Sequence, residues 1–109
     1  MAGLDANSTA GMHFDLAELD GHDLSVTISG ELDITNVDAL ESAVGSALRH
    51  HPGRLIIELS ELRFADSSAI ALWVRWSTAV HEIELRDVSP ILRRVIDSMG
   101  LADTLNVKP

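Results

Sequence analysis

The fold of this chain is decided by the stretch "RLIIELSELRFADSSAIALWV", residues 54–74, in which a short polar segment separates two apolar runs. The first run, Leu55 to Leu59, is short and dense, which is typical of a buried central strand. The second run covers residues 67–79 and has the length and apolar density of a helix that packs on a sheet. A strand, a loop and a helix in this order predict an α/β fold.

The sequence before this stretch predicts a hairpin and a helix. Residues 13–19 ("HFDLAEL") and 24–30 ("LSVTISG") alternate apolar and polar positions around a "DGHD" turn. This alternation indicates two paired strands with one buried face. A helix should follow, with Thr35 as its cap, and should end before Pro52.

The sequence after it predicts one more strand and a last helix. Residues 82–88 ("EIELRDV") alternate, and Ser89, Pro90 and Gly100 provide the signals that cap, start and end a helix. The element order is therefore ββαβαβα, an α/β domain whose mixed β-sheet carries its helices mainly on one face. We expect this single domain to cover residues 12–109, after a flexible N-terminal lead over residues 1–11.

Composition and charge exclude several classes of function. The 109 residues include 17 acidic and 8 basic ones, a net charge of −9, whereas nucleic-acid binding requires clustered Lys and Arg. The absence of cysteine excludes disulfides and thiolate metal sites. No apolar run has the length of a membrane span. We therefore expect a cytoplasmic protein that binds no nucleic acid, membrane, metal or cofactor.

The two serines at the start of the central helix carry the candidate chemistry. Ser67 is placed to cap the helix, and Ser68 would then occupy its first position. Backbone N–H groups and the helix dipole favour an anion at such a place. A phosphate on Ser68 would add about −1.5 to −2 charges at pH 7 beside Asp66, which would switch off a docked partner. Plain helix capping explains the same residues without a function.

Hydrolysis and metal binding are poorly supported by the sequence. A serine hydrolase needs a histidine positioned beside its nucleophile, and no histidine here belongs to a recognisable nucleophile motif. Neighbouring histidines on a helix point in different directions, which argues against a metal site at His50 and His51. We therefore expect no enzymatic activity. The histidines are scattered along the chain: His13, His22, His50, His51 and His81.

Three segments together resemble the STAS domain family, and specifically its bacterial anti-sigma factor antagonists. They are "GELDITNVDAL" (30–40), "LIIELSELRFADSSAIALWV" (55–74) and "LRDVSPILRRVIDSMGLADTL" (85–105). Each segment is a weak signal, but their order and spacing are fairly specific. The resemblance covers nearly the whole chain after residue 12.

The resemblance implies a regulatory protein rather than an enzyme. Such proteins bind an anti-sigma factor, which is a serine kinase, and thereby release a sigma factor. The kinase phosphorylates a serine that corresponds to Ser68, and a PP2C-type phosphatase reverses the reaction. The same resemblance places Asp33, Asp66, Ser67 and Ala69 at the surface that binds the partner.

Two other functions remain open at this point. Stand-alone STAS domains also brace the ATPase of lipid-transport ABC complexes, and others are scaffolds that are never phosphorylated. Ala69 stands where the family usually has Gly, so it favours slow phosphorylation or the scaffold. Trp73 is expected in the core. Trp76, beside Arg75, is expected to be partly exposed and to contact a partner or a second copy in a weak homodimer.

Overall fold

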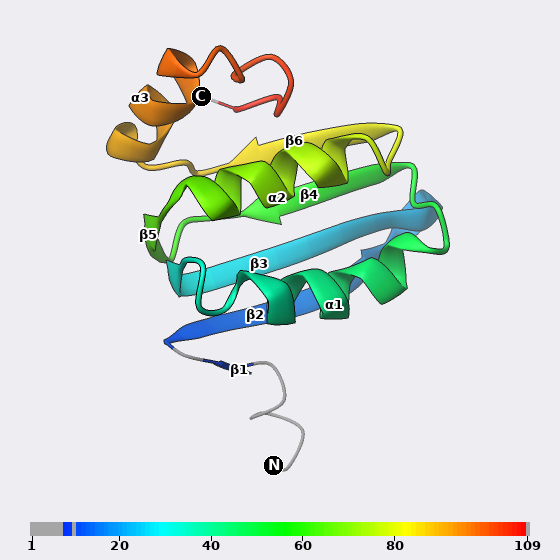
Figure 1. The fold of residues 1–109 in the computed structure, drawn as a ribbon. Coiled ribbons are helices and arrows are strands. Elements are labelled where there is room, and N and C mark those ends of the chain that lie inside the picture. Colours follow the sequence, from blue (N-terminus) through cyan, green and yellow to red (C-terminus); the bar gives the residue numbers. More distant parts are fainter. Residues whose placement is uncertain (1–7, 10, 109) are drawn as a thin grey trace.

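The computed structural model describes residues 8–9 and 11–108. Most of the expected N-terminal lead, residues 1–7 and 10, lies outside the described residues, and so does residue 109. Figure 1 shows a single sheet with two helices across one face and a third helix at its edge. The helix bounds are α1 (Val37–Leu48), α2 (Ser67–Ser77) and α3 (Pro90–Ser98), and a short 3-10 turn covers Asp20–His22.

The sheet is mixed, as the sequence predicts. Its strands run in the order β1-β2-β3-β4-β6, and β5 pairs separately with β3. β2 pairs antiparallel with β1 and β3, whereas β3, β4 and β6 are parallel neighbours. The expected α/β class and mixed sheet are confirmed. The strand bounds are β1 (Ser8–Thr9), β2 (Met12–Leu19), β3 (Asp23–Leu32), β4 (Arg54–Glu58), β5 (Leu62–Ala65) and β6 (Glu82–Arg86).

The central strand lies where the dense apolar run predicts it. β4 is bonded on both edges, to β3 and to β6, and its three middle residues are buried. Leu55 and Ile57 belong to the core under the helices, whereas Ile56 points to the opposite face. This arrangement explains why the run is apolar without alternation: both faces of the strand are covered.

β5 is a strand where the sequence analysis expects only a loop. It pairs in parallel with the end of β3, joining Gly30 to Leu62 and Leu32 to Ala65, beyond the point where β4 has left β3. Leu62 and Ala65 pack against the core, but the two residues between them are exposed. The strand is short and half exposed, and its register shifts by one residue, so its sequence shows no clean alternation.

Both tryptophans of α2 are buried, which corrects the expectation for Trp76. Trp73 is fully buried, as expected, but Trp76 is only 3% exposed. The reason is that α2 packs against α1 as well as against the sheet, so its buried face is wide. A contact between Trp76 and a partner or a second copy is therefore not available in this fold. No helix within the described residues is long and apolar enough to cross a membrane.

Candidate functional site

Asp66, not Ser67, caps the central helix. Its Oδ1 accepts hydrogen bonds from the N–H of Ser68 at 3.0 Å and from the N–H of Ala69 at 3.3 Å. Ser67 therefore occupies the first helical position and Ser68 the second, one place later than expected. Aspartate and serine are both good caps, and the extended backbone of Asp66 brings its carboxylate over the free N–H groups.

Ser68 is hydrogen-bonded to the capping carboxylate. Its hydroxyl donates to Oδ1 of Asp66 at 2.5 Å, and its side chain is half-buried. Ser67, in contrast, is exposed. The two neighbouring hydroxyls are thus inequivalent: the one on Ser68 is fixed in direction by a charge, as hydrogen bonds to ionised groups are strong.

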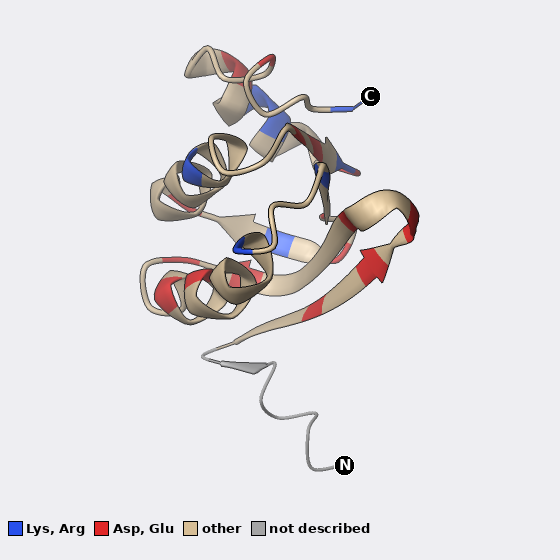
Figure 2. Cartoon of the chain, turned by 90° about the vertical axis from the view of Figure 1, so that its right-hand side faces the viewer, with Lys and Arg blue, Asp and Glu red and all other residues tan. Residues whose placement is uncertain are grey.

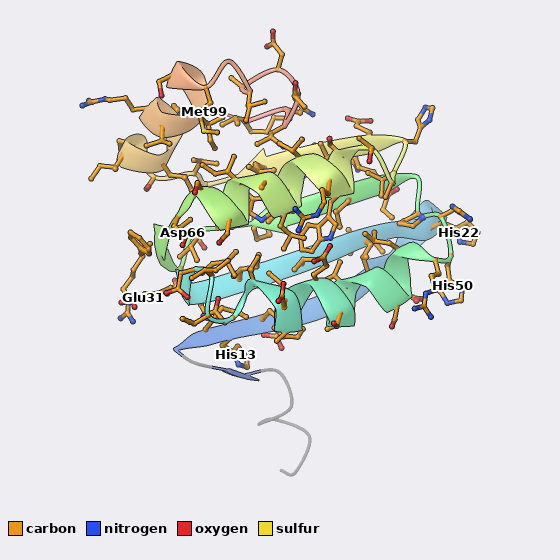
Figure 3. The ribbon with its side chains drawn as sticks, viewed as in Figure 1. His13, His22, Glu31, His50, Asp66 and Met99 are labelled. Carbon is orange, nitrogen blue, oxygen red and sulfur yellow. The ribbon has the colours of Figure 1, made fainter. Side chains whose placement is uncertain are left out.

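The second oxygen of Asp66 ties the helix to the loop after β3. Oδ2 accepts the N–H of Ile34 at 3.2 Å, so the sequence-distant segments 33–36 and 66–69 meet at one end of the sheet. Figure 3 shows Asp66 at this end, close to the end of β3 where Glu31 lies. The structure therefore brings Asp33 and Asp66 to one surface, together with Ser67 and Ser68.

The loop after β3 is built by its own side chains. Oδ1 of Asp33 accepts the N–H of Thr35 at 2.9 Å and its hydroxyl at 2.5 Å. Thr35 is therefore occupied within the loop and does not cap α1, which begins at Val37 after Asn36. Such local Asp and Thr bonds compete with helix capping, which is why the expected cap is wrong.

Two residues of this loop were missed in the sequence analysis. Asn36 is buried; its Oδ1 accepts the N–H of Asp33 at 3.0 Å and its Nδ2 donates to the carbonyl of Glu31 at 2.9 Å. Ile34 is 70% exposed beside Asp66. The available signals were the Asp and Asn pair that marks a turn and an isolated apolar residue inside a polar loop.

Gly30 is required where β3 approaches the turn before β2. Its φ is +88°, and a Cβ at this position would lie 2.3 Å from the carbonyl oxygen of Gly11. Only glycine avoids both problems. The N–H of Gly30 also donates to the carbonyl of Glu61 at 3.1 Å, just before β5. Gly30 thereby fixes the backbone that leads into the loop of Asp33.

The carboxyl of Asp66 is held in its charged form. Partial burial alone raises its pKa, but hydrogen bonds from the Ser68 hydroxyl and from the N–H groups of Ala69, Ile34 and Ser68 outweigh burial. The pKa of Asp66 therefore lies below its ordinary value of 3.8. At neutral pH the surface beside Ser68 carries a fixed negative charge.

Ala69 lies beneath this surface rather than on it. Its side chain is 0% exposed and belongs to the core cluster. The methyl group of Ala69 therefore faces the protein interior, whereas exposed and half-buried neighbours form the surface of the candidate site. An effect of Ala69 on a partner would have to pass through the position of α2.

A hollow at the opposite end of the sheet has, among the described residues, no hydrogen-bonded serine and carboxylate like those at the start of α2. It encloses about 360 Å³ beside the β2–β3 turn, and His22 and His50 line it. Within residues 8–9 and 11–108, no group of three or more His, Asp or Glu side chains is arranged to hold a metal ion. The start of α2 is therefore the candidate site.

Comparison with known proteins identifies the family of this chain. The family model described as "Mlab, STAS domain" matches residues 16–107. Anti-sigma-F factor antagonist RsfB of Mycobacterium tuberculosis is 29% identical over 85 residues, which cover 75% of this chain and 70% of RsfB.

Solved structures show the same fold. An anti-sigma factor antagonist from Mycobacterium paratuberculosis superposes with a TM-score of 0.81 at 26% identity, covering 90% of this chain and 86% of the other. The unphosphorylated anti-sigma factor antagonist SpoIIAA superposes with a TM-score of 0.76 at 22% identity, covering 88% of each chain. The family model spans most of the sequence, including both segments of the site, and this chain belongs to the STAS domain family.

Proposed function

We propose that this chain is an anti-sigma factor antagonist that acts by binding and is switched by phosphorylation of Ser68. The observation that carries the proposal is the hydrogen bond from the Ser68 hydroxyl to Asp66, the same carboxylate that anchors the loop at Ile34. The relatives RsfB and the M. paratuberculosis protein are both anti-sigma factor antagonists, which supports the same function.

The partner is an anti-sigma factor with serine kinase activity. It docks on the surface formed by Asp33, Ile34, Asp66 and Ser67, around Ser68. The exposed Ile34 offers an apolar contact, and the two carboxylates can pair with basic side chains of the partner. Binding of the anti-sigma factor releases the sigma factor in the cytoplasm.

Phosphorylation of Ser68 changes this surface through Asp66. The phosphoryl group replaces the hydroxyl proton that Ser68 donates to Oδ1, and it brings about −1.5 to −2 charges next to a carboxylate. The carboxylate and the phosphate repel each other and compete for the free N–H groups of α2. Because Asp66 also holds Ile34, the loop loses its anchor, and the surface changes in both charge and shape.

Ser68 is a better target than Ser67 because only the Ser68 hydroxyl is bonded to Asp66. The hydroxyl of Ser67 is exposed at the first helical position, and no described residue accepts a hydrogen bond from it. A phosphate there would add charge without displacing the cap. A PP2C-type phosphatase that removes the phosphate from Ser68 would restore the bond to Asp66 and the binding surface.

The test recovers partners from the source cell and measures their affinity. A serine kinase should be captured and should phosphorylate the wild type on Ser68 with ATP, while Ser68→Ala should bind but remain unmodified. Phospho-Ser68 protein should bind at least about tenfold more weakly, or about 1.4 kcal/mol. Ser68→Asp should show a smaller loss, because aspartate has less charge than phosphate. Ser67→Ala is the matched control for the switch: it removes the neighbouring hydroxyl, but the variant should still be phosphorylated on Ser68 and should still lose affinity when Ser68 is phosphorylated.

Three results would contradict the proposal. Equal affinity of wild-type and phospho-Ser68 protein would remove the switch. Capture of a transporter ATPase would assign the chain to the ABC accessory subunits of the sequence analysis. A bound partner that never phosphorylates Ser68 would leave the scaffold as the function.

A further inference from the structure

An exposed apolar groove lies between β5 and α3, next to the candidate site. It encloses about 400 Å³, and strand β5 forms one wall while the first turns of α3 form the other. Three apolar side chains on its walls face solvent: Phe64 is 53% exposed, Ile91 78% and Val95 41%. Apolar residues gathered in one groove mark an interaction site more often than scattered ones do.

The strand that forms one wall has a free edge. β5 pairs with β3 on one side, and within the described residues no strand pairs with its other side. The N–H of Asp66 donates to Leu32 in β3, so in a parallel ladder the neighbouring Ala65 directs its N–H and carbonyl away from β3, towards α3. An unpaired edge of this kind is a template for another strand.

One basic residue lines the groove and another lies near it on α3, although the chain is strongly acidic. Arg63 lines the groove, and Arg94 stands one helical turn after Ile91 on α3. Within the described residues, neither forms an ion pair; Arg49, Arg93 and Lys108 also have none, whereas Arg54, Arg75 and Arg86 are paired. Figure 2 shows basic positions on α3, while acidic positions dominate α1 and the β2–β3 hairpin. Two cations without an internal counter-ion, close to one groove, are suited to carboxylates from outside.

We propose that this groove binds an extended, acidic and apolar segment of the protein that docks at Ser68, as an added strand on β5. The free edge supplies backbone hydrogen bonds, the exposed side chains of Phe64, Ile91 and Val95 receive alternate apolar residues, and Arg63 and Arg94 receive carboxylates. β5 has 4 residues and is about 13 Å long at ~3.3 Å per residue, which suits one short segment.

The groove and the phosphorylation site form one continuous surface. β5 ends at Ala65, and Asp66 follows it directly, so a segment bound along β5 ends beside the cap of α2. The identity of the partner therefore rests on the proposed function. The groove adds affinity and orientation that do not depend on Ser68 itself.

The first experiment uses a phage-displayed library of random peptides, selected on the wild-type chain. Recovered peptides should alternate apolar residues and contain Asp or Glu. They should bind Ile91→Ser and Arg63→Glu at least about tenfold more weakly than wild type. Leu19→Ser is the matched control: Leu19 is also exposed, at 42%, but lies at the end of β2, so its replacement should not change binding.

The binding mode has its own measurement. Hydrogen exchange at the amide of Ala65 should slow when a selected peptide is bound, because the added strand accepts its hydrogen bond. Basic or helical peptides, unchanged exchange at Ala65, or no enrichment would each overturn the proposal. So would self-association in sedimentation that Ile91→Ser abolishes, since the groove would then hold a second copy.

Affinity for the captured kinase separates this proposal from the proposed function. If phosphorylation of Ser68 releases the kinase while Ile91→Ser and Arg63→Glu bind it like wild type, the antagonist function stands and the groove proposal fails. If no kinase is recovered but acidic peptides bind along β5, the groove is a peptide site and the antagonist function fails.

Discussion

Asp66 divides its two carboxylate oxygens between two parts of the chain. One oxygen caps α2 and receives the Ser68 hydroxyl, and the other holds the N–H of Ile34. A single side chain therefore connects the helix start to the loop after β3. Any change in its charge or position alters both segments, which is the property that a phosphorylation switch needs.

Replacement of Asp66 by alanine should lower stability in a pH-dependent way. We expect a loss of about 1–2 kcal/mol at pH 7, because the cap of α2 is removed. The folded-state pKa of Asp66 lies below 3.8, so its charged form stabilises the fold above that pH. The contribution is lost as pH falls through the folded-state pKa, and the two proteins should converge in that range.

Urea denaturation of the wild type and Asp66→Ala at a series of pH values measures this difference. Ser68→Ala tests whether the Ser68 hydroxyl lowers the pKa of Asp66. Without this hydroxyl the pKa of Asp66 should rise, so the stabilisation by the charged carboxylate should be lost at a higher pH than in the wild type. A constant difference down to pH 2 would mean that the carboxylate is not held by these bonds.

The sequence predicted the place of this site but not its chemistry. Asp66, Ser67 and Ser68 are each acceptable caps, and propensity does not choose between neighbours that differ by one position. Asp66 is also held by Ile34, which is 32 residues away and donates a hydrogen bond to the second carboxylate oxygen of Asp66. A long-range contact of this kind is absent from a local pattern.

At the scale of elements, β3 pairs with two different strands along one edge. Its first half pairs with β4 in the centre of the sheet, and its last residues pair with β5 near the site. The dense run of β4 was recognisable because burial on both faces removes alternation. β5 was not recognisable from its sequence, because its two middle residues are exposed and it is a strand only through its pairing with β3.

Gly30 stands at the change between these two halves, and Gly30→Ala should destabilise the chain. The methyl group would meet the carbonyl of Gly11 at a φ that alanine avoids, so we expect a loss of about 2–4 kcal/mol. Gly45→Ala is the matched control. It lies inside α1 with open space at its Cβ position, and it should stabilise by about 0.5–1 kcal/mol.

Thermal and urea unfolding of the two glycine variants measures the contrast. If Gly30→Ala were as stable as wild type, the approach of β3 to Gly11 would be wrong. The connection from Gly30 to Glu61 and β5 would then lose its support, and with it the placement of the loop of Asp33.

At the scale of the molecule, the two faces of the sheet are closed in different ways. α1 and α2 cover one face with apolar side chains (Figure 1), and this layered arrangement was predictable from periodicity. The burial of Trp76 was not predictable from periodicity, because it depends on how α2 packs against α1. The other face carries charged side chains of three neighbouring strands, and Ile56 is buried among them at 2% exposure.

Glu84 is the centre of that charged face. It is only 4% exposed, and it accepts hydrogen bonds from Arg54 at 3.5 Å and from Arg86, which also contacts Glu58 at 3.4 Å. A buried carboxylate between two guanidinium groups is balanced only while all partners remain. Removal of Glu84 takes away the buried acceptor that both guanidinium groups share, and it leaves Arg54 paired with Asp23 and Arg86 paired with Glu58.

Glu84→Ala should therefore destabilise the chain by about 1–3 kcal/mol, because buried hydrogen bonds to two charged groups are lost while Asp23 and Glu58 still pair with the arginines. Glu82→Ala is the matched control, because Glu82 is exposed on the same strand and the same face, and its loss should stay within about 0.5 kcal/mol. Urea denaturation at low and high salt measures both variants. A loss of unfolding free energy below about 0.5 kcal/mol for Glu84→Ala would mean that the bonds from Arg54 and Arg86 to Glu84 do not stabilise this face. Partner binding at the distant start of α2 should be unchanged in the folded fraction of either variant.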